Sequence, residues 1–171
     1  LNKNCIEMRF QELEQYVLDA EKAFEQGHYL EGKAFLESAL TEEPTYGKAH
    51  NHLGWLYLGR LDDIEKAERH LRLALKYSQK YSAPYIHLIS LLFDSKRLEE
   101  HGHLIAAAME VPGVSRSFLY SEKGKAFEVK GKYTQAIKWY RKAIRWSMDE
   151  SEITAVRNYM RRAKSKRWLF L

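Results

Sequence analysis

The feature that most constrains the fold of this chain is a spacing that recurs along its whole length. Alanine followed by a large apolar residue recurs at a regular interval, at Ala39-Leu40, Ala74-Leu75, Ala108-Met109 and Ala143-Ile144. Successive pairs lie 35, 34 and 35 residues apart. A second pattern, Gly-x-Tyr, begins at Gly27 and again at Gly131, and these lie 104 residues apart, which equals the three intervals together. A period of this length predicts a repeat protein.

Each period contains two stretches with the spacing of an amphipathic helix. In the fourth period, Tyr120, Gly124 and Phe127 precede a turn at Gly131. Apolar residues then recur every three or four positions over residues 136–144, which is the spacing of one helix face. The repeating unit is therefore predicted to be a helix-turn-helix, and the chain to be all-α.

Small and large residues have separate roles in the expected packing. Gly54 and Gly124 lie on first helices, where they would let the second helix of the same unit approach closely, opposite an alanine. Large side chains such as Leu71 and Tyr140 are expected to fill the space between units. One helix pair cannot bury its own apolar face, so each unit depends on its neighbours.

These residues resemble the tetratricopeptide repeat family, whose pattern is W-x2-L-G-x2-Y…A-x3-F…P. In the second period, His50-x2-Leu53-Gly54-x2-Tyr57 matches this pattern with His in the tryptophan place. The third period is the most divergent, with Ile89 in the glycine place. The resemblance implies a right-handed α-solenoid of four helix-turn-helix repeats plus a C-terminal capping helix. Helical RNA-reading repeats share the alanine spacing but usually lack the Leu-Gly…Tyr and Gly-x-Tyr patterns, so we rank them lower.

The repeats are expected at 13–46, 47–81, 82–116 and 117–150. Residues 1–12 continue the apolar spacing of the first helix and are expected to extend it backwards, with a coiled-coil partner as the alternative. Residues 151–171 are expected to form the capping helix and a basic, apolar tail that ends in Trp168-Leu169-Phe170-Leu171. The tail docks back onto the fold, inserts into another surface such as a membrane, or is the stump of a longer chain, and we rank docking and truncation above membrane contact.

The resemblance also implies a binding surface, because the family binds ligands on the concave face formed by the first helices. Trp55 and Phe93 would be apolar anchors, and the Asn51 amide can both donate to and accept from a peptide backbone. The alternative is that Trp55 and Phe93 only pack between units. The expected groove residues are Lys48, Asn51, His52, Trp55, Ile86, His87, Ser90, Phe93, Ser121 and Lys125. The function implied is a protein-interaction adaptor or scaffold that binds a peptide or helix.

The charge of the chain is uneven, and this suggests an alternative function. The net charge is +5, but residues from Ser117 onwards hold fourteen Lys+Arg and five Asp+Glu. A basic surface at this end could bind nucleic acid, although a run of charge is more often a solvated face, so we expect nucleic acid to be an unlikely partner. The basic residues concerned are Arg157, Arg161, Arg162, Lys164, Lys166 and Arg167.

No motif for catalysis, phosphate binding or metal binding stands out in the sequence. His101 and His103 are two positions apart, which places them on different sides of a helix and makes them a poor chelating pair. Cys5 is the only cysteine, and no apolar run is long enough to span a membrane. We therefore expect a cytoplasmic protein that is not an enzyme and has no cofactor or metal. Its partner is expected to be another protein, and self-association is possible.

Overall fold

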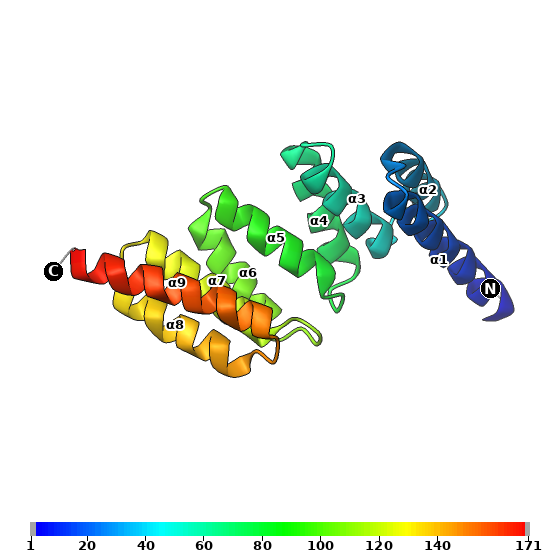
Figure 1. The fold of residues 1–171 in the computed structure, drawn as a ribbon. Helices are drawn as coiled ribbons and strands as arrows, with labels where there is room; N and C mark the ends of the chain where they lie inside the picture. Colours follow the sequence, from blue (N-terminus) through cyan, green and yellow to red (C-terminus); the bar gives the residue numbers. More distant parts are fainter. Residues whose placement is uncertain (1–2, 170–171) are drawn as a thin grey trace. The chain divides into compact units, whose positions relative to one another are not determined.

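The computed structural model describes the backbone of residues 3–169 and the side chains of residues 7–169 (Figure 1). Its described residues form nine helices and no strand. Residues 1–2 of the expected N-terminal extension, and Phe170 and Leu171 of the expected tail, lie outside this part. The helices are α1 (Lys3–Glu25), α2 (Tyr29–Glu42), α3 (Gly47–Gly59), α4 (Ile64–Tyr77), α5 (Ala83–Asp94), α6 (Leu98–Ala108), α7 (Arg116–Val129), α8 (Tyr133–Trp146) and α9 (Glu150–Leu169). The expected fold class, an all-α helical repeat, is confirmed.

Two compact units divide the chain, Leu1–Leu88 and Ile89–Leu171, and the division falls inside α5. In the first unit α1 packs against α2, and α3 packs against both α2 and α4. The core of this unit is built from fully buried leucines and alanines. They include Ala20, Leu36, Ala39, Leu53, Leu56, Leu71 and Ala74.

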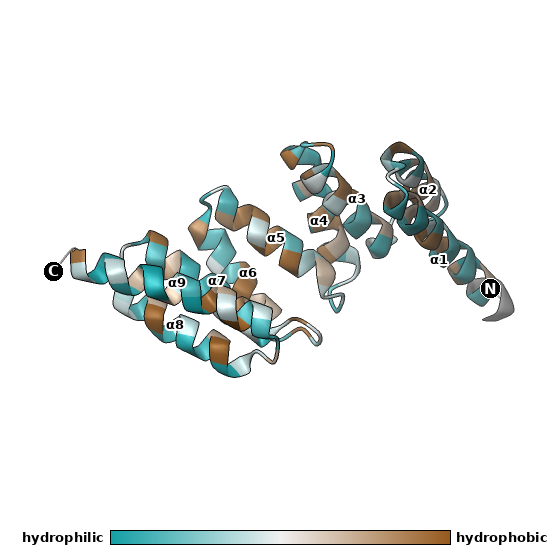
Figure 2. Cartoon of the chain, in the orientation of Figure 1, coloured by the Kyte–Doolittle hydropathy of each residue, from teal (hydrophilic) through white to brown (hydrophobic). Residues whose placement is uncertain are grey.

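In the second unit α7 packs against α8, and α8 packs against α9. Figure 2 shows hydrophobic and hydrophilic residues alternating along α8, as expected for a helix that buries one face. Tyr140 and Ala143 of α8 are fully buried and share a core with Val156 and Ala163 of α9. The last helix therefore covers the apolar edge of the fourth helix pair, as the expected capping helix would.

The turns inside the helix pairs share one backbone feature. In each case a residue with positive φ lies two positions before the first residue of α2, α4, α6 or α8; these residues are Gly27 (+80°), Asp62 (+51°), Lys96 (+59°) and Gly131 (+71°). Glycine adopts this conformation without strain, whereas a side chain crowds the following carbonyl group. Two of the four turns therefore use the residue that the geometry favours and two do not.

Close packing within the pairs differs from the sequence-based expectation in one respect. A Cβ atom placed on Gly54 would lie 2.7 Å from the Leu71 side chain, and one on Gly124 would lie 2.4 Å from the Tyr140 ring. Leu71 and Tyr140 thus pack over the glycines of their own helix pairs, and Tyr140 also shares a core with Val156 and Ala163 of α9. The missing glycine side chain makes room for a large residue of the same pair, a contact that the sequence-based expectation did not include.

None of the helices in residues 3–169 is both long and apolar enough to cross a membrane.

Candidate functional site

A cavity of about 350 Å³ opens in the first unit, and four of the expected groove residues line it. We call it the first-unit cavity. Its walls come from α1, α3 and the part of α5 that belongs to this unit. The lining residues are Glu21, Phe24, Glu25, Asn51, His52, Trp55 and His87.

The aromatic wall of this cavity is fixed by ring packing. The rings of Phe24 and Trp55 lie 5.4 Å apart in a tilted arrangement, and Phe24 also stacks on Tyr29 at 6.1 Å. The guanidinium of Arg60 lies over Tyr29 and Trp55, at 5.0 and 5.9 Å from the ring centres. Trp55 is half-buried, so part of its ring stays open to a ligand while its neighbours hold its orientation.

The polar wall contains two histidines. His52 Nε2 lies 3.4 Å from Glu21 Oε1. Burial lowers the pKa of His52 below the ordinary histidine value, and burial together with the nearby His52 lowers the pKa of His87. Both rings are therefore held in the neutral form at pH 7, in which each can donate one hydrogen bond and accept another.

Asn51 has one unsatisfied hydrogen-bonding atom. Its Nδ2 donates to the Tyr81 hydroxyl at 3.3 Å, and the residue is 4% exposed. Its Oδ1 is buried and accepts no hydrogen bond from any described residue. A buried acceptor without a donor is unfavourable, and a ligand N–H group would remove that cost.

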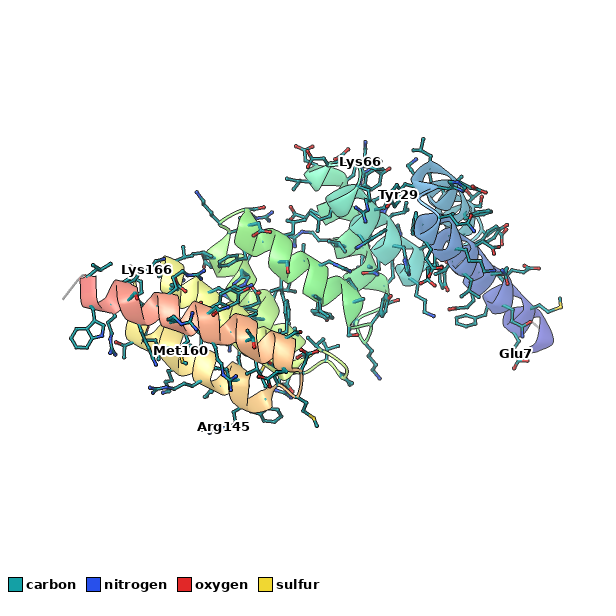
Figure 3. All side chains as sticks on the ribbon, viewed as in Figure 1. Glu7, Tyr29, Lys66, Arg145, Met160 and Lys166 are labelled. Carbon is teal, nitrogen blue, oxygen red and sulfur yellow. The ribbon has the colours of Figure 1, made fainter. Side chains whose placement is uncertain are left out.

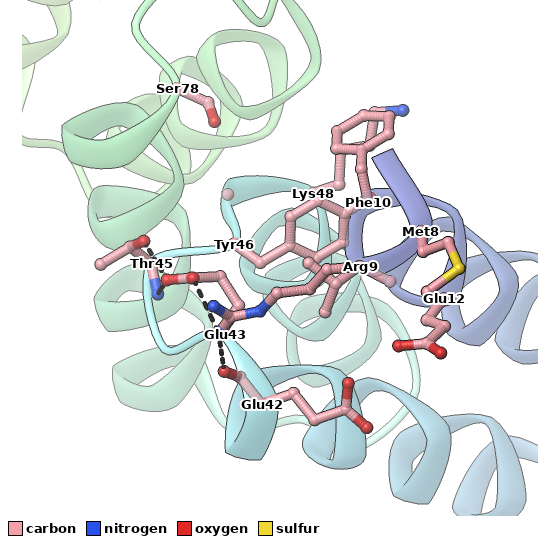
Figure 4. Close-up of a pocket in the computed structure, with 12 residues that line it drawn as sticks. Met8, Arg9, Phe10, Glu12, Glu42, Glu43, Thr45, Tyr46, Lys48 and Ser78 are labelled. Atoms are coloured by element: carbon pink, nitrogen blue, oxygen red, sulfur yellow. Dashed lines mark hydrogen bonds and ion pairs between the residues drawn. The ribbon is translucent and has the colours of Figure 1, made fainter. Parts of the chain in front are cut away.

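Two expected groove residues of the first unit lie elsewhere. Ile86 is half-buried on α5. The Lys48 ammonium pairs with Glu14 Oε1 at 2.5 Å, and the residue lines a different cavity near the N-terminal end of the unit. This N-terminal cavity, of about 810 Å³, lies beside α1 and the segment that joins α2 to α3. Figure 4 shows Arg9 reaching across it to the Glu42 carbonyl oxygen and to the Glu43 carboxylate.

The second unit has its own cavity, of about 290 Å³, formed by α5, α7 and α9. We call it the second-unit cavity. Phe93 and Lys125, both expected groove residues, line it together with Asp94, Glu128, Val129, Tyr159, Arg162 and Lys166. Of the other expected residues in this unit, Ser121 is buried and Ser90 is half-buried.

Lys125 connects several elements of this unit. Its ammonium lies 2.7 Å from Glu122 Oε1, 5.9 Å from the Phe93 ring centre and 5.3 Å from that of Tyr159. Burial alone would raise the pKa of Glu122, but hydrogen bonds from His101 and Lys125 outweigh burial and hold this pKa below its usual value. The Lys125 charge is therefore largely matched by a buried carboxylate.

Glu128 binds two of the residues that the sequence analysis assigned to a basic surface. The Arg162 guanidinium and the Lys166 ammonium both lie at its carboxylate, with Lys166 Nζ 3.1 Å from Oε1. The Tyr140 hydroxyl donates to the same carboxylate at 2.8 Å. Burial would raise the pKa of Glu128, but these donors together hold it below the usual value.

The other basic residues of α9 have different surroundings. Arg157 pairs with Glu150 at 3.2 Å, while Arg161 and Lys164 are exposed. Arg167 is half-buried, with its guanidinium 5.8 Å from the ring centre of Trp168. Trp168 and Leu169 are 72% and 78% exposed, so the described part of the tail does not dock onto the fold.

Some residues of these sites were not identified from the sequence. Tyr159 enters the second-unit cavity from α9, which the sequence analysis treated only as a cap. His50 Nδ1 lies 3.0 Å from His70 Nδ1, although these residues belong to different helices and no spacing connects them. Glu128 and Arg162 carry opposite charges and lie 34 residues apart, which is close to the repeat period, but this spacing alone does not show that they pair.

Comparison with known proteins supports the same fold. The family model described as tetratricopeptide repeat matches residues 47–81 and 119–149. No curated protein matches the sequence. Among solved structures, PilF of Pseudomonas aeruginosa is similar with a TM-score of 0.75 and 20% identity, over 95% of this chain and 76% of that one.

Two further structures are similar to the chain. MamA has a TM-score of 0.67 and 16% identity, over 91% of this chain and 92% of that one. YrrB, described as a TPR protein with an unusual peptide-binding site, has a TM-score of 0.68 and 19% identity, over 84% of this chain and 73% of that one. At these identities the likeness concerns the fold. Two segments of the chain thus match the tetratricopeptide repeat model, and the structural likeness confirms that the chain has an all-α helical repeat fold.

Proposed function

We propose that the chain is a cytoplasmic protein-interaction module that binds a peptide segment of a partner protein in the first-unit cavity. The observation that carries the proposal is the Asn51 side chain, which has a buried Oδ1 without a donor in the wall of an aromatic cavity. Tetratricopeptide repeats are generally protein-interaction modules, and the similar YrrB is described as having a peptide-binding site.

The chemistry of the cavity supports a peptide as the ligand. Phe24 and Trp55 offer an apolar wall for one side chain of the ligand. Asn51 can accept from a backbone N–H group, and the neutral rings of His52 and His87 can donate to carbonyl groups. Anchoring of one apolar side chain in a pocket, with polar groups fixing the backbone, is a common mode of peptide recognition.

Nucleic acid is the second candidate partner, and the ion pairs of α9 weaken its case. Arg162 and Lys166 bind Glu128, and Arg157 binds Glu150. Phosphate contacts by these three residues would have to displace the carboxylates that they already bind. Binding of nucleic acid is therefore expected to be weak at ~150 mM salt, where phosphate contacts are strongly screened.

The test begins with selection of binding peptides from a random display library on the intact chain. The dissociation constants of the selected peptides are then measured by fluorescence polarisation for the wild type and for Trp55→Ala and Asn51→Ala. Loss of an anchor at the centre of a binding site typically costs ~2 kcal/mol, so each variant should bind about 30-fold more weakly.

Leu30→Ala is the matched control, because Leu30 is a 74% exposed apolar residue of the same unit outside the cavity. It should bind the selected peptides as the wild type does. Circular dichroism of all variants checks that the helices remain intact. The proposal fails if the library yields no binder, or if the peptides bind folded Trp55→Ala and Asn51→Ala with unchanged affinity.

A further inference from the structure

A second surface of the second unit combines aromatic rings with lysines and lies outside the second-unit cavity. Tyr120 of α7 stacks on Trp139 of α8 at 5.6 Å and meets Trp146 edge-on at 6.3 Å. The Lys142 ammonium lies 4.5 Å from the Trp139 ring centre and 5.7 Å from that of Tyr120. The Lys123 ammonium lies 4.9 Å from the Trp139 ring centre. We call these five residues the lysine–tryptophan face.

This face is positively charged, and its charge is not neutralised locally. Helix α8 contains Lys138, Arg141, Lys142 and Arg145 and no acidic residue. Among the described residues, no ion pair joins a carboxylate to any of these four or to Lys123. Other cations of the same unit, such as Arg162, are paired, so this surface keeps an uncompensated charge that favours an acidic partner.

An apolar cavity of about 240 Å³ adjoins the face, with Lys123 and Trp139 contributing to both. Its lining is mostly apolar and comes from α6, α7, α8 and Lys130, the residue that follows α7. Besides Trp139, its large apolar residues are Leu98, Ile105 and Phe127, and Lys130 supplies a second ammonium group besides that of Lys123. The cavity therefore offers space for one aliphatic or aromatic side chain between two positive charges.

These features favour a peptide over a nucleic acid as the occupant. The rings of Trp139 and Tyr120 are already covered by lysine ammonium groups, which leaves less open ring surface for base stacking. A phosphate backbone gains nothing from an apolar cavity, whereas a side chain of a peptide gains by burial there. The lysines, each held over a ring, are already placed to receive carboxylates.

We propose that this surface binds an acidic segment of a partner protein. An apolar side chain of the segment enters the cavity beside Phe127, and flanking Asp or Glu side chains pair with Lys123, Lys130 and Lys142. The site is separate from the first-unit cavity proposed above. It also differs from the second-unit cavity, because Lys123 and Lys125 lie two positions apart on α7 and point to different sides of the helix.

The test uses synthetic fluorescent peptides on the intact chain, measured by fluorescence polarisation at ~150 mM salt. The probe peptides have a central Leu, Phe or Trp between Asp/Glu-rich flanks. One matched set has Gly at the centre, and another has Asn and Gln in place of the acids. Binding is expected for at least one probe and is expected to fall about 10-fold or more in both matched sets, since each loses one element of recognition.

Two variants identify the surface. Lys123→Gln with Lys142→Gln removes two charges from the face. Gly102→Leu fills the cavity, because Gly102 lines it and a Cβ there meets no atom within 4 Å. Each is expected to weaken probe binding about 10-fold. Arg161→Gln with Lys164→Gln is the control, since it removes the same charge from two exposed residues of α9 that lie outside the lysine–tryptophan face. This control should bind nearly as the wild type does.

Several outcomes would overturn the proposal. One is the absence of binding by every probe, and another is an equal loss in the control double variant, which would reveal a response to net charge alone. Tighter binding of a single-stranded oligonucleotide or of anionic phospholipid vesicles than of any probe, lost in Lys123→Gln with Lys142→Gln, would assign the face to those ligands instead. Trp55→Ala should leave probe binding unchanged, so failure here and failure of the first-unit cavity remain distinguishable.

Discussion

Arg162 and Glu128 form a two-point ion pair that fastens α9 to α7. Arg162 Nε lies 2.7 Å from Glu128 Oε1, and its Nη2 lies 3.0 Å from Oε2. The carboxylate is nearly buried and also accepts a hydrogen bond from the hydroxyl of the fully buried Tyr140. Such a fork-to-fork geometry is stronger and more directional than a single charge contact. Lys166, labelled on α9 in Figure 3, adds a second cation to the same carboxylate.

Replacing Arg162 by Ala should loosen α9, because Glu128 would lose its main partner in a nearly buried position. We expect the free energy of unfolding to fall by about 1–2 kcal/mol, a value reduced because half of the arginine side chain is exposed. Arg161→Ala is the control, since Arg161 is an exposed arginine of the same helix. Urea unfolding measures both variants, and hydrogen exchange should show faster exchange in α9 for Arg162→Ala. Equal stability of the two variants would contradict this prediction.

Gly124→Ala should destabilise the second unit, because the new Cβ would lie 2.4 Å from the Tyr140 ring. Crowding of a packed interior typically costs about 1–3 kcal/mol. Gly102→Ala provides the comparison in another helix of the same unit, where a Cβ meets no atom within 4 Å. There the better helix propensity of alanine should raise stability by about 0.5–1 kcal/mol. Thermal unfolding should show a lower stability for Gly124→Ala and a higher stability for Gly102→Ala than for the wild type. A Gly124→Ala protein as stable as the wild type would refute the packing argument.

Lys96→Gly should stabilise the chain, because Lys96 has a φ of +59° in a turn at which Gly27 and Gly131 take a similar conformation in other helix pairs. A side chain in this region costs about 1–2 kcal/mol, and part of the gain is offset by the larger freedom of glycine in the unfolded state. A net gain of about 0.5–1 kcal/mol is expected in urea unfolding. The reverse change, Gly131→Lys, should lower stability. A loss of stability in Lys96→Gly would show that its side chain has a role that outweighs the strain.

Stability should decrease in acid because of the His50–His70 pair. His50 Nε2 donates to the Pro44 carbonyl oxygen, so a neutral His50 accepts from His70 through Nδ1, 3.0 Å away. Burial, with a smaller effect of His50, lowers the pKa of His70 to about 4. The unfolded chain takes up a proton at His70 near pH 6.5, whereas the folded chain does not. The contribution of neutral His70 to the free energy of unfolding is therefore fully present above pH 6.5 and is lost as the pH falls towards 4.

The measurement is the free energy of unfolding in urea at pH 7.5, 6, 5 and 4.5. His70→Gln should show a smaller decrease over this range than the wild type, because one titrating ring has been removed. His28→Gln is the control, since His28 has a 60% exposed side chain. Parallel pH curves for the wild type and His70→Gln would contradict the assignment.

The sequence by itself determined the helical repeat. The 34–35-residue spacing and the glycines at positions 27 and 131 could be recognised because each repeat places small residues and turns at equivalent positions. The same residue types therefore recur along the chain. The capping role of α9 followed from the same logic, since the last unit would otherwise expose an apolar edge. The sequence also predicted one shared surface for four residues that line the first-unit cavity, because equivalent positions of the first helices recur with the repeat. These residues are Asn51, His52, Trp55 and His87.

Only the tertiary structure decided how individual side chains are used. Lys48 pairs with Glu14 and Arg162 with Glu128, and both choices depend on distances between helices that no spacing encodes. The sequence placed Arg162 among solvent-facing charges because composition cannot distinguish a paired cation from a free one. Leu71 packs over Gly54 because a glycine leaves a space that the nearest large side chain fills. Periodicity thus fixes which helices form and in what order, while charge pairing and the filling of space are settled only when those helices meet.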